Sequence, residues 1–366
     1  MKKSAGAAGH LLLCLFFLLS LASCGMGGGG TGGSAPPSST FSALGVKSFG
    51  AIAVDKATNN VWVAYGTSSG GGGLMEIPST ATSCATTTDC PLISLGFTPA
   101  GIAVDSLGNI WVTNDTTSGS VTEIPVSIAS HFTGTTSCPS SSCPTFTGFS
   151  SPTGIAGDSN KNIWVTNTSS NSVTEIPSGA ASCSSCKTFS GDFSSPTGIA
   201  VDSNNNVWVT NDSSSSGSVT KISSTAAISG TCSPTYCPTF LGFSNPVAVA
   251  TTGTTPWVAN SGSGGSYPQA VVEINNSCTS SVCPQITHFT QPVGLAFDPS
   301  GNLWVIDAGN TTTVEITASA ISSTGCATSS PCYQYSLPSV PAGIATDSSG
   351  HVWISLQKAQ VIEYKP

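Results

Sequence analysis

The seven tryptophans of this 366-residue chain recur at an almost constant interval. Successive tryptophans are 49, 53, 44, 49, 47 and 49 residues apart, at Trp62, Trp111, Trp164, Trp208, Trp257, Trp304 and Trp353. A period in the forties is typical of the four-stranded blade of a β-propeller, which buries its core by stacking on its neighbours. The interval therefore predicts an all-β, seven-bladed β-propeller, with six blades as the less favoured alternative.

The repeated unit divides into short strands and turns. Its clearest copy, residues 195–222, reads Ser-Pro-Thr-Gly-Ile-Ala-Val-Asp, an Asn-rich turn, Val-Trp-Val-Thr-Asn, a Ser-rich loop and Ser-Val-Thr-Lys-Ile. β-branched and aromatic residues favour strands, whereas Asp, Asn and Ser favour turns. We therefore predict strands at 198–201, 206–210 and 218–222, and an outer strand such as 145–149 in the second copy. Only 7% of the residues are charged, which argues against long surface helices.

The two ends of the repeat region are out of phase with each other. The last copy stops at residues 361–364, after its third strand, whereas residues 40–45 resemble an outer strand that no blade precedes. The N-terminal strand is therefore predicted to complete the last blade and to close the ring, which leaves no open edge in the middle of the sheet array.

Residues 1–23 are typical of a secretory signal peptide. The first three residues are cationic, residues 11–22 are apolar, and the Leu-Ala-Ser-Cys sequence at 21–24 resembles the lipobox of bacterial lipoproteins. The resemblance implies a lipid on Cys24, and Gly25 in place of Asp implies transport to the outer membrane. A signal peptide with a chance cysteine is the alternative. We expect a tether at 24–40, a propeller at 41–366, and a lipid-anchored location in the cell envelope, at the outer membrane or cell surface.

Twelve further cysteines fall into six local pairs, one in each blade except the last. The pairs are Cys84/Cys90, Cys138/Cys143, Cys183/Cys186, Cys232/Cys237, Cys278/Cys283 and Cys326/Cys332. A secreted chain lies in an oxidising compartment, so each pair is predicted to form a disulfide between the third and fourth strands. The Cys-Ser-Ser-Cys pair could alternatively be a redox pair or half of a zinc site.

The repeat also resembles known families. The pattern Pro-x-Gly-Ile-Ala-Val-Asp-x-x-Gly-Asn-Val-Trp-Val-Thr resembles the NHL repeat, and Ser-Val-Thr-Glu-Ile-Pro resembles the blades of the virginiamycin B lyase family. The second resemblance implies histidine and glutamate at the channel mouth, which hold magnesium and serve an elimination. Here the residues after the repeat's proline are Ala100, Thr153, Thr197, Val247, Val293 and Ala342, which cannot act as acid or base. We therefore predict no cofactor and keep a metal-dependent lyase or hydrolase as an alternative.

Two carboxylate series follow the repeat. The aspartates precede the first hairpin turn and are predicted to cap its backbone amides: Asp55, Asp105, Asp158, Asp202, Asp298 and Asp347. The glutamates lie late in the third strand and are predicted to pack within the blade: Glu76, Glu123, Glu175, Glu273, Glu315 and Glu363. A metal ring and paired catalytic carboxylates are the alternatives. Of the histidines, His351 falls in a hairpin turn and His288 is interpreted as an isolated, hydrogen-bonded residue.

A polar series three residues after each tryptophan supplies the candidate ligand face. Its members are Asn114, Asn167, Asn211, Asn260 and Asp307. They either end the second strand or form a neutral platform for a sugar or peptide. The chain has no arginine and a net charge of −8, which argues against nucleic acid. We expect a monomeric, non-enzymatic scaffold that binds a glycan, a peptide or a protein, with a structural envelope protein as a further alternative.

Overall fold

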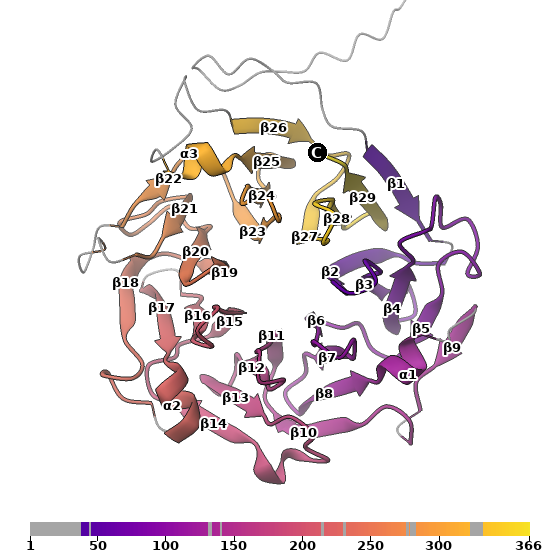
Figure 1. Cartoon of the computed structure of the whole chain (residues 1–366), viewed down its shortest axis with the longest axis horizontal. Helices are drawn as coiled ribbons and strands as arrows, with labels where there is room; N and C mark the ends of the chain where they lie inside the picture. Colours follow the sequence, from indigo (N-terminus) through magenta and orange to yellow (C-terminus); the bar gives the residue numbers. More distant parts are fainter. Residues whose placement is uncertain are drawn as a thin grey trace, which may run out of the picture.

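The computed structural model describes residues 38–43, 45–130, 134–139, 141–213, 216–229, 232–275, 278, 283–322 and 332–366. These residues form seven sheets around a central axis, antiparallel except where one added strand joins the first sheet (Figure 1). The predicted seven-bladed propeller is confirmed. We number the blades along the chain and letter their strands a to d from the axis outwards.

The first four blades contain the following strands. Blade 1 has β2 (Ser48–Val54), β3 (Val61–Gly66), β4 (Gly72–Ile77), β5 (Leu92–Ser94) and an added β9 (Thr135–Ser137). Blade 2 has β6 (Ile102–Val104), β7 (Ile110–Asn114), β8 (Gly119–Ile124) and β10 (Thr145–Phe149). Blade 3 has β11 (Pro152–Gly157), β12 (Ile163–Asn167), β13 (Ser172–Ile176) and β14 (Lys187–Ser190). Blade 4 has β15 (Pro196–Val201), β16 (Val207–Asn211), β17 (Gly217–Ile222) and β18 (Thr239–Phe243).

The last three blades complete the circle. Blade 5 has β19 (Pro246–Thr252), β20 (Thr255–Asn260), β21 (Ala270–Glu273) and β22 (Gln285–Ile286). Blade 6 has β23 (Pro292–Phe297), β24 (Leu303–Asp307), β25 (Thr312–Ile316) and β26 (Cys332–Ser336). Blade 7 has β27 (Pro341–Thr346), β28 (Val352–Leu356), β29 (Gln360–Tyr364) and β1 (Ser38–Ser42). Strands b and c are buried on both faces, because each blade packs between two others.

The ring closes through the N-terminal strand. β1 pairs antiparallel with β29, with Phe41 opposite Val361, so one strand from the start of the chain completes the last blade. The Phe41 side chain is 1% exposed, and its ring centroid lies 5.5 Å from that of Trp353. The predicted closure is confirmed, although the strand begins at Ser38 rather than at residue 40.

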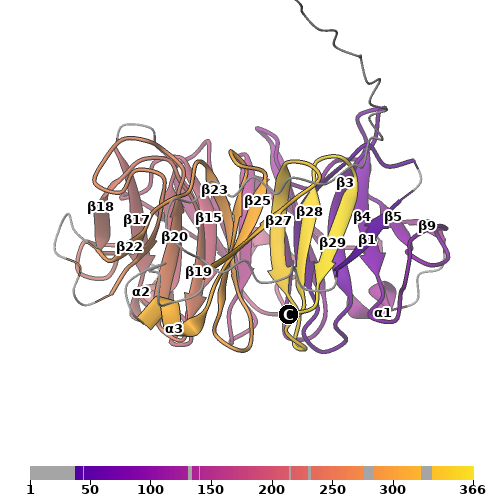
Figure 2. The ribbon, with the colours of Figure 1, turned by 90° about the horizontal axis from the view of Figure 1, so that it is seen from above.

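Two faces result from the alternating strand directions. The mouth face carries the b–c loops, such as residues 168–171, and the d–a loops, such as 191–195. The turn face carries the a–b turns and the c–d connections. Short helices occupy the c–d connections: α1 (Val126–Ala129), η1 (Cys183–Ser185), α2 (Ser224–Ser229) and α3 (Ala318–Ser322). Figure 2 shows α1, α2 and α3 towards the lower side of the ring.

Neighbouring blades are joined by hydroxyl groups in the middle of strand b. The Thr166 hydroxyl accepts a hydrogen bond from the Gly154 amide at 2.8 Å and donates to the Thr197 carbonyl of blade 4 at 3.0 Å. Thr113 makes the equivalent pair of bonds between blades 2 and 3. A Cβ on Gly154 would collide with the Thr197 carbonyl, so this position admits only glycine. The sequence analysis did not predict this bridge.

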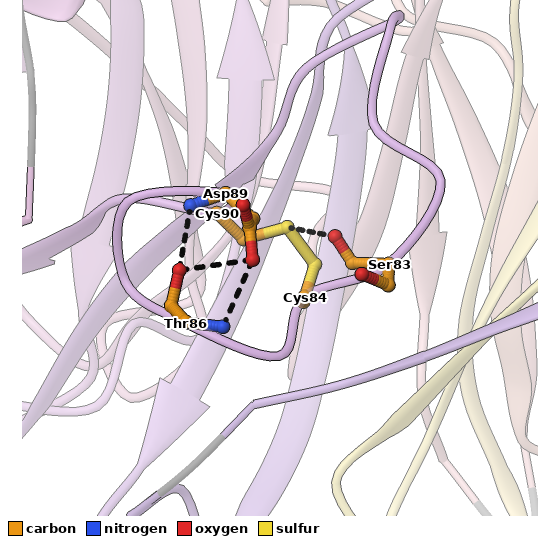
Figure 3. Close-up of a disulfide and its surroundings, with 5 residues drawn as sticks. All are labelled: Ser83, Cys84, Thr86, Asp89 and Cys90. Atoms are coloured by element: carbon orange, nitrogen blue, oxygen red, sulfur yellow. Dashed lines mark hydrogen bonds between the residues drawn. A yellow bond between two sulfur atoms is a disulfide. The ribbon is translucent and has the colours of Figure 1, made fainter.

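Five of the six predicted disulfides join the expected partners: Cys84–Cys90, Cys138–Cys143, Cys183–Cys186, Cys232–Cys237 and Cys278–Cys283. Cys332 is also disulfide-bonded, whereas Cys326 lies outside the described residues. Each bond closes a short loop on the turn face. In the first loop, the Asp89 carboxylate also accepts hydrogen bonds from the amide and hydroxyl of Thr86 (Figure 3).

Two features of the fold lie apart from the repeat. β9, in the c–d connection of blade 2, pairs in parallel with β5 of blade 1, with Leu92 opposite Thr135. β9 covers the edge of β5, an outer strand of only three residues. The sequence analysis did not predict this pairing. Residues 1–37, which include the predicted signal peptide and Cys24, lie outside the described residues. Among those that are described, no helix is long and apolar enough to cross a membrane.

Candidate functional site

The five candidate ligand-face residues end strand b of successive blades, but they do not form an accessible platform. Asn114 is half-buried. The exposed fractions of the other side chains are only 2% for Asn167, 0% for Asn211, 0% for Asn260 and 1% for Asp307. Burial removes these four groups from the reach of a ligand on the mouth face.

Their polar atoms are also engaged within the blade. The Asn211 amide donates to the Ser218 and Thr220 hydroxyls, both at 3.0 Å, and its oxygen accepts from the Ser194 amide at 3.1 Å. The Asp307 carboxylate accepts hydrogen bonds from the backbone amides of Thr290 and Gln291. The ligand-face prediction is therefore corrected: the series fastens the d–a loops to strand b, because a buried polar group needs its partners inside the protein.

The aspartate series caps the a–b turns, as predicted. The Asp202 carboxylate accepts the backbone amides of Asn204 and Asn206, both at 2.9 Å, and the indole Nε1–H of Trp208 at 3.0 Å. The same bond to the indole recurs in blades 2, 3, 6 and 7. The repeated spacing of Asp and Trp thus reflects one hydrogen-bonded unit in each of these five blades.

The glutamates pack against this unit from strand c. Each lies opposite the tryptophan of its blade, as Glu175 lies opposite Trp164. In blade 1 the Glu76 carboxylate accepts a 2.7 Å hydrogen bond from Asn60. Burial raises the pKa of Glu76 to about 7, and the nearby Asp55 adds to this rise. The glutamates face the interior of the blade rather than the central channel.

Blade 7 carries His351 at the position where five other blades carry asparagine. Its Nδ1 lies 3.2 Å from the Asp347 carboxylate and 3.0 Å from the Glu363 carboxylate. These groups line a pocket of about 70 Å³ on the turn face, together with Asn59 and Ser79 from blade 1. Across the described residues, no group of three or more His, Cys, Asp and Glu side chains is placed to hold a metal ion. His288 is exposed, and His131 lies outside the described residues.

A cavity with a volume of about 360 Å³ occupies the central channel. One aliphatic side chain from each blade forms a collar around it: Ile52, Ile102, Ile155, Ile199, Val249, Leu295 and Ile344. Towards the mouth face the wall continues with Ala100, Thr153, Thr197, Val247 and Ala342, five of the six mouth positions named from the sequence. The wall contains no titratable side chain. It offers an apolar collar beneath a small rim of methyl and hydroxyl groups.

The comparisons with known proteins agree with the propeller fold. The NHL repeat family matches residues 193–222, which is the repeat of blade 4. Virginiamycin B lyase from Staphylococcus aureus is 13% identical, with a TM-score of 0.65 over 90% of this chain and 99% of that chain. A catalytically inactive variant of that enzyme with quinupristin is 14% identical, with a TM-score of 0.66 over 90% and 99% of the two chains.

A hydrazine synthase from Kuenenia stuttgartiensis is 12% identical, with a TM-score of 0.70 over 88% of this chain and 97% of that chain. No curated protein matches the sequence. At these identities the likeness concerns the fold. The chain is thus a seven-bladed β-propeller. One of its repeats matches the NHL repeat family, and its fold is similar to that of virginiamycin B lyase.

Proposed function

We propose that this protein is a lipid-anchored binding scaffold of the cell envelope, without enzymatic activity, which holds part of a glycan or peptide in the mouth of its central channel. One observation carries the proposal. The channel contains a cavity of about 360 Å³ whose wall is aliphatic and hydroxylic, with no side chain that could act as acid or base. A concave apolar surface with a few polar groups is typical of ligand sites.

The second candidate is a lyase or hydrolase of the virginiamycin B lyase-like type, which the similarity of the folds favours. An elimination needs a base near the substrate and a group that stabilises the developing charge. The cavity wall supplies neither. The described cluster that combines histidine with carboxylates, around His351, lies on the turn face.

Anchoring is tested by metabolic labelling with a fatty-acid probe. The wild-type chain is expected to incorporate the label and Cys24→Ser to lose it, because the thioether requires the Cys24 sulfur. Cys14→Ser is the matched control: this cysteine lies within the predicted signal peptide, so the variant is expected to keep the label. Equal labelling of the wild type and Cys24→Ser would contradict lipidation at this residue.

Ligand binding is tested with glycan and peptide arrays, using a chain that begins at Ser34 and so contains every described residue. Ala100 is exposed and lines the cavity, so Ala100→Trp is expected to fill the mouth and weaken binding by about tenfold or more, equivalent to about 1.4 kcal/mol. Leu107→Trp places the same side chain at an exposed position on the turn face and is expected to change nothing. If a ligand binds and Ala100→Trp does not weaken it, the channel is excluded as the binding site. If no ligand binds, a structural role of the protein in the envelope is favoured.

A further inference from the structure

Asp212 lies on the mouth face at the start of the b–c loop of blade 4 and does not itself line the cavity. Its backbone amide donates to the Ser195 carbonyl at 3.0 Å, and the preceding Asn211 pairs with Pro196. Thr197, the next residue along this strand, lines the cavity. The Asp212 backbone therefore lies just outside the cavity wall, on the side of the mouth face.

The same position in two other blades is occupied by a hydroxyl group that is fully used. Thr168 of blade 3 donates to the Pro196 carbonyl at 2.8 Å and contacts the Thr153 hydroxyl at 2.9 Å. Ser261 of blade 5 donates to the Pro292 carbonyl. In both cases the side chain reaches the proline that begins strand a of the next blade. A carboxylate cannot donate such a bond, so Asp212 does not repeat this contact.

The Asp212 carboxylate is one of six groups among the described side chains that have a buried polar atom without a hydrogen-bond partner. Its Oδ1 atom is buried and accepts no hydrogen bond from the described residues. Burial raises the pKa of this carboxyl above its ordinary value. A polar atom that is buried without a partner destabilises the folded state, so its presence calls for another explanation, such as a ligand.

The charges of the mouth face indicate which ligand group suits this atom. Asp115, Asp192 and Asp212 lie in the loops of blades 2 to 4. Lys47 and Lys358 lie in loops at the junction of blades 7 and 1, on the opposite side of the ring (Figure 1). No lysine lies in the described mouth-face loops of blades 2 to 4. A cation is therefore favoured beside blade 4, and an anion is disfavoured there.

We propose that Asp212 recognises a protonated amine of a ligand whose aliphatic part enters the central cavity. The inference rests on the proposed binding function and names the chemistry of the ligand: an apolar group for the collar, and an ammonium group for the half-buried carboxylate of Asp212. An ammonium donates the hydrogen bond that the protein does not supply, and its positive charge is opposite to that of the carboxylate.

Three probes with one tail and different head groups test this inference: hexylammonium, hexan-1-ol and hexanoate. Their binding is measured by saturation-transfer NMR titration at low ionic strength, where electrostatic differences are least screened. The wild type is expected to bind hexylammonium most tightly and hexanoate most weakly. Asp212→Asn keeps the shape of the side chain and is expected to weaken hexylammonium binding by roughly five- to tenfold, with hexan-1-ol unchanged.

Asp115→Asn is the matched control, because Asp115 holds the equivalent position in blade 2 and is exposed. It is expected to change hexylammonium binding less than about twofold. Thermal unfolding should show Asp212→Asn to be at least as stable as the wild type, since it removes a partly buried charge. A merely structural role for Asp212 would instead lower the melting temperature and leave the order of the probes unchanged.

The outcomes separate the two proposals. If Ala100→Trp abolishes binding of all three probes but Asp212→Asn keeps the preference for hexylammonium, the role of Asp212 is overturned and the channel site stands. If Ala100→Trp leaves hexylammonium binding unchanged, the channel is not the site, and both proposals fail for this ligand class. Failure of hexylammonium to bind the wild type overturns the amine inference, while an array ligand blocked by Ala100→Trp would still support the channel.

Discussion

Phe41→Ala is expected to lower the free energy of unfolding by about 3–5 kcal/mol, which is large for a residue so near the start of the described chain. The Phe41 side chain is buried, its ring contacts that of Trp353 at a tilt, and it packs in one core cluster with Val361. Truncation would leave a cavity between the first and last strands of the ring. Blade 7 takes β1 from the start of the described chain and β27, β28 and β29 from its end. Loss of β1 would therefore open the ring of the propeller.

Thr40→Ala is the control for this prediction. Thr40 lies on the same strand with an exposed side chain, so its truncation is expected to change stability by less than about 0.5 kcal/mol. Both variants are compared by urea denaturation with the disulfides intact. Deletion of residues 38–42 should cost more than Phe41→Ala, because it also removes the hydrogen-bonded ladder to β29. An unchanged melting temperature in the deletion variant would contradict the assigned closure.

Asp202→Ala is expected to lower the free energy of unfolding by about 3 kcal/mol or more, which is the second large effect. Asp202 is 4% exposed, and its carboxylate accepts two backbone amides of the turn, the Asn206 side-chain amide and the Trp208 indole. Alanine would leave these donors buried without an acceptor. Each buried donor that loses its partner contributes about 1–3 kcal/mol of destabilisation.

Blade 1 offers a matched comparison for Asp202. Asp55 occupies the same repeat position, but it accepts hydrogen bonds from the Ala57 amide and the Thr58 hydroxyl at an exposed turn. Water can replace it there, so Asp55→Ala is expected to cost only about 1 kcal/mol. Equal losses of stability in the two variants, measured by guanidinium denaturation, would show that burial of the turn does not govern the effect.

The fold could be predicted from local patterns in the chain. The interval between tryptophans equals the length of one blade, so counting them counts the blades. The two cysteines of each pair are three to six residues apart, so each cysteine has its partner within its own loop. The phase of the first strand implied its pairing with β29, because an outer strand needs a blade to join. These inferences succeed because each repeat encodes its own hydrogen bonds and hydrophobic faces.

The candidate site depended on contacts between segments that are distant in sequence. Asn211 and Asp212 are adjacent polar residues at the end of one strand, and the sequence analysis named only the first as a candidate ligand residue. The d–a loop covers Asn211 and bonds to it, while the carboxylate oxygen of Asp212 has no partner among the described residues. The sequence by itself determined the propeller, its closure and its disulfides. Which polar groups remained available at the channel was decided only by the tertiary structure, because burial depends on how neighbouring blades and their loops pack together.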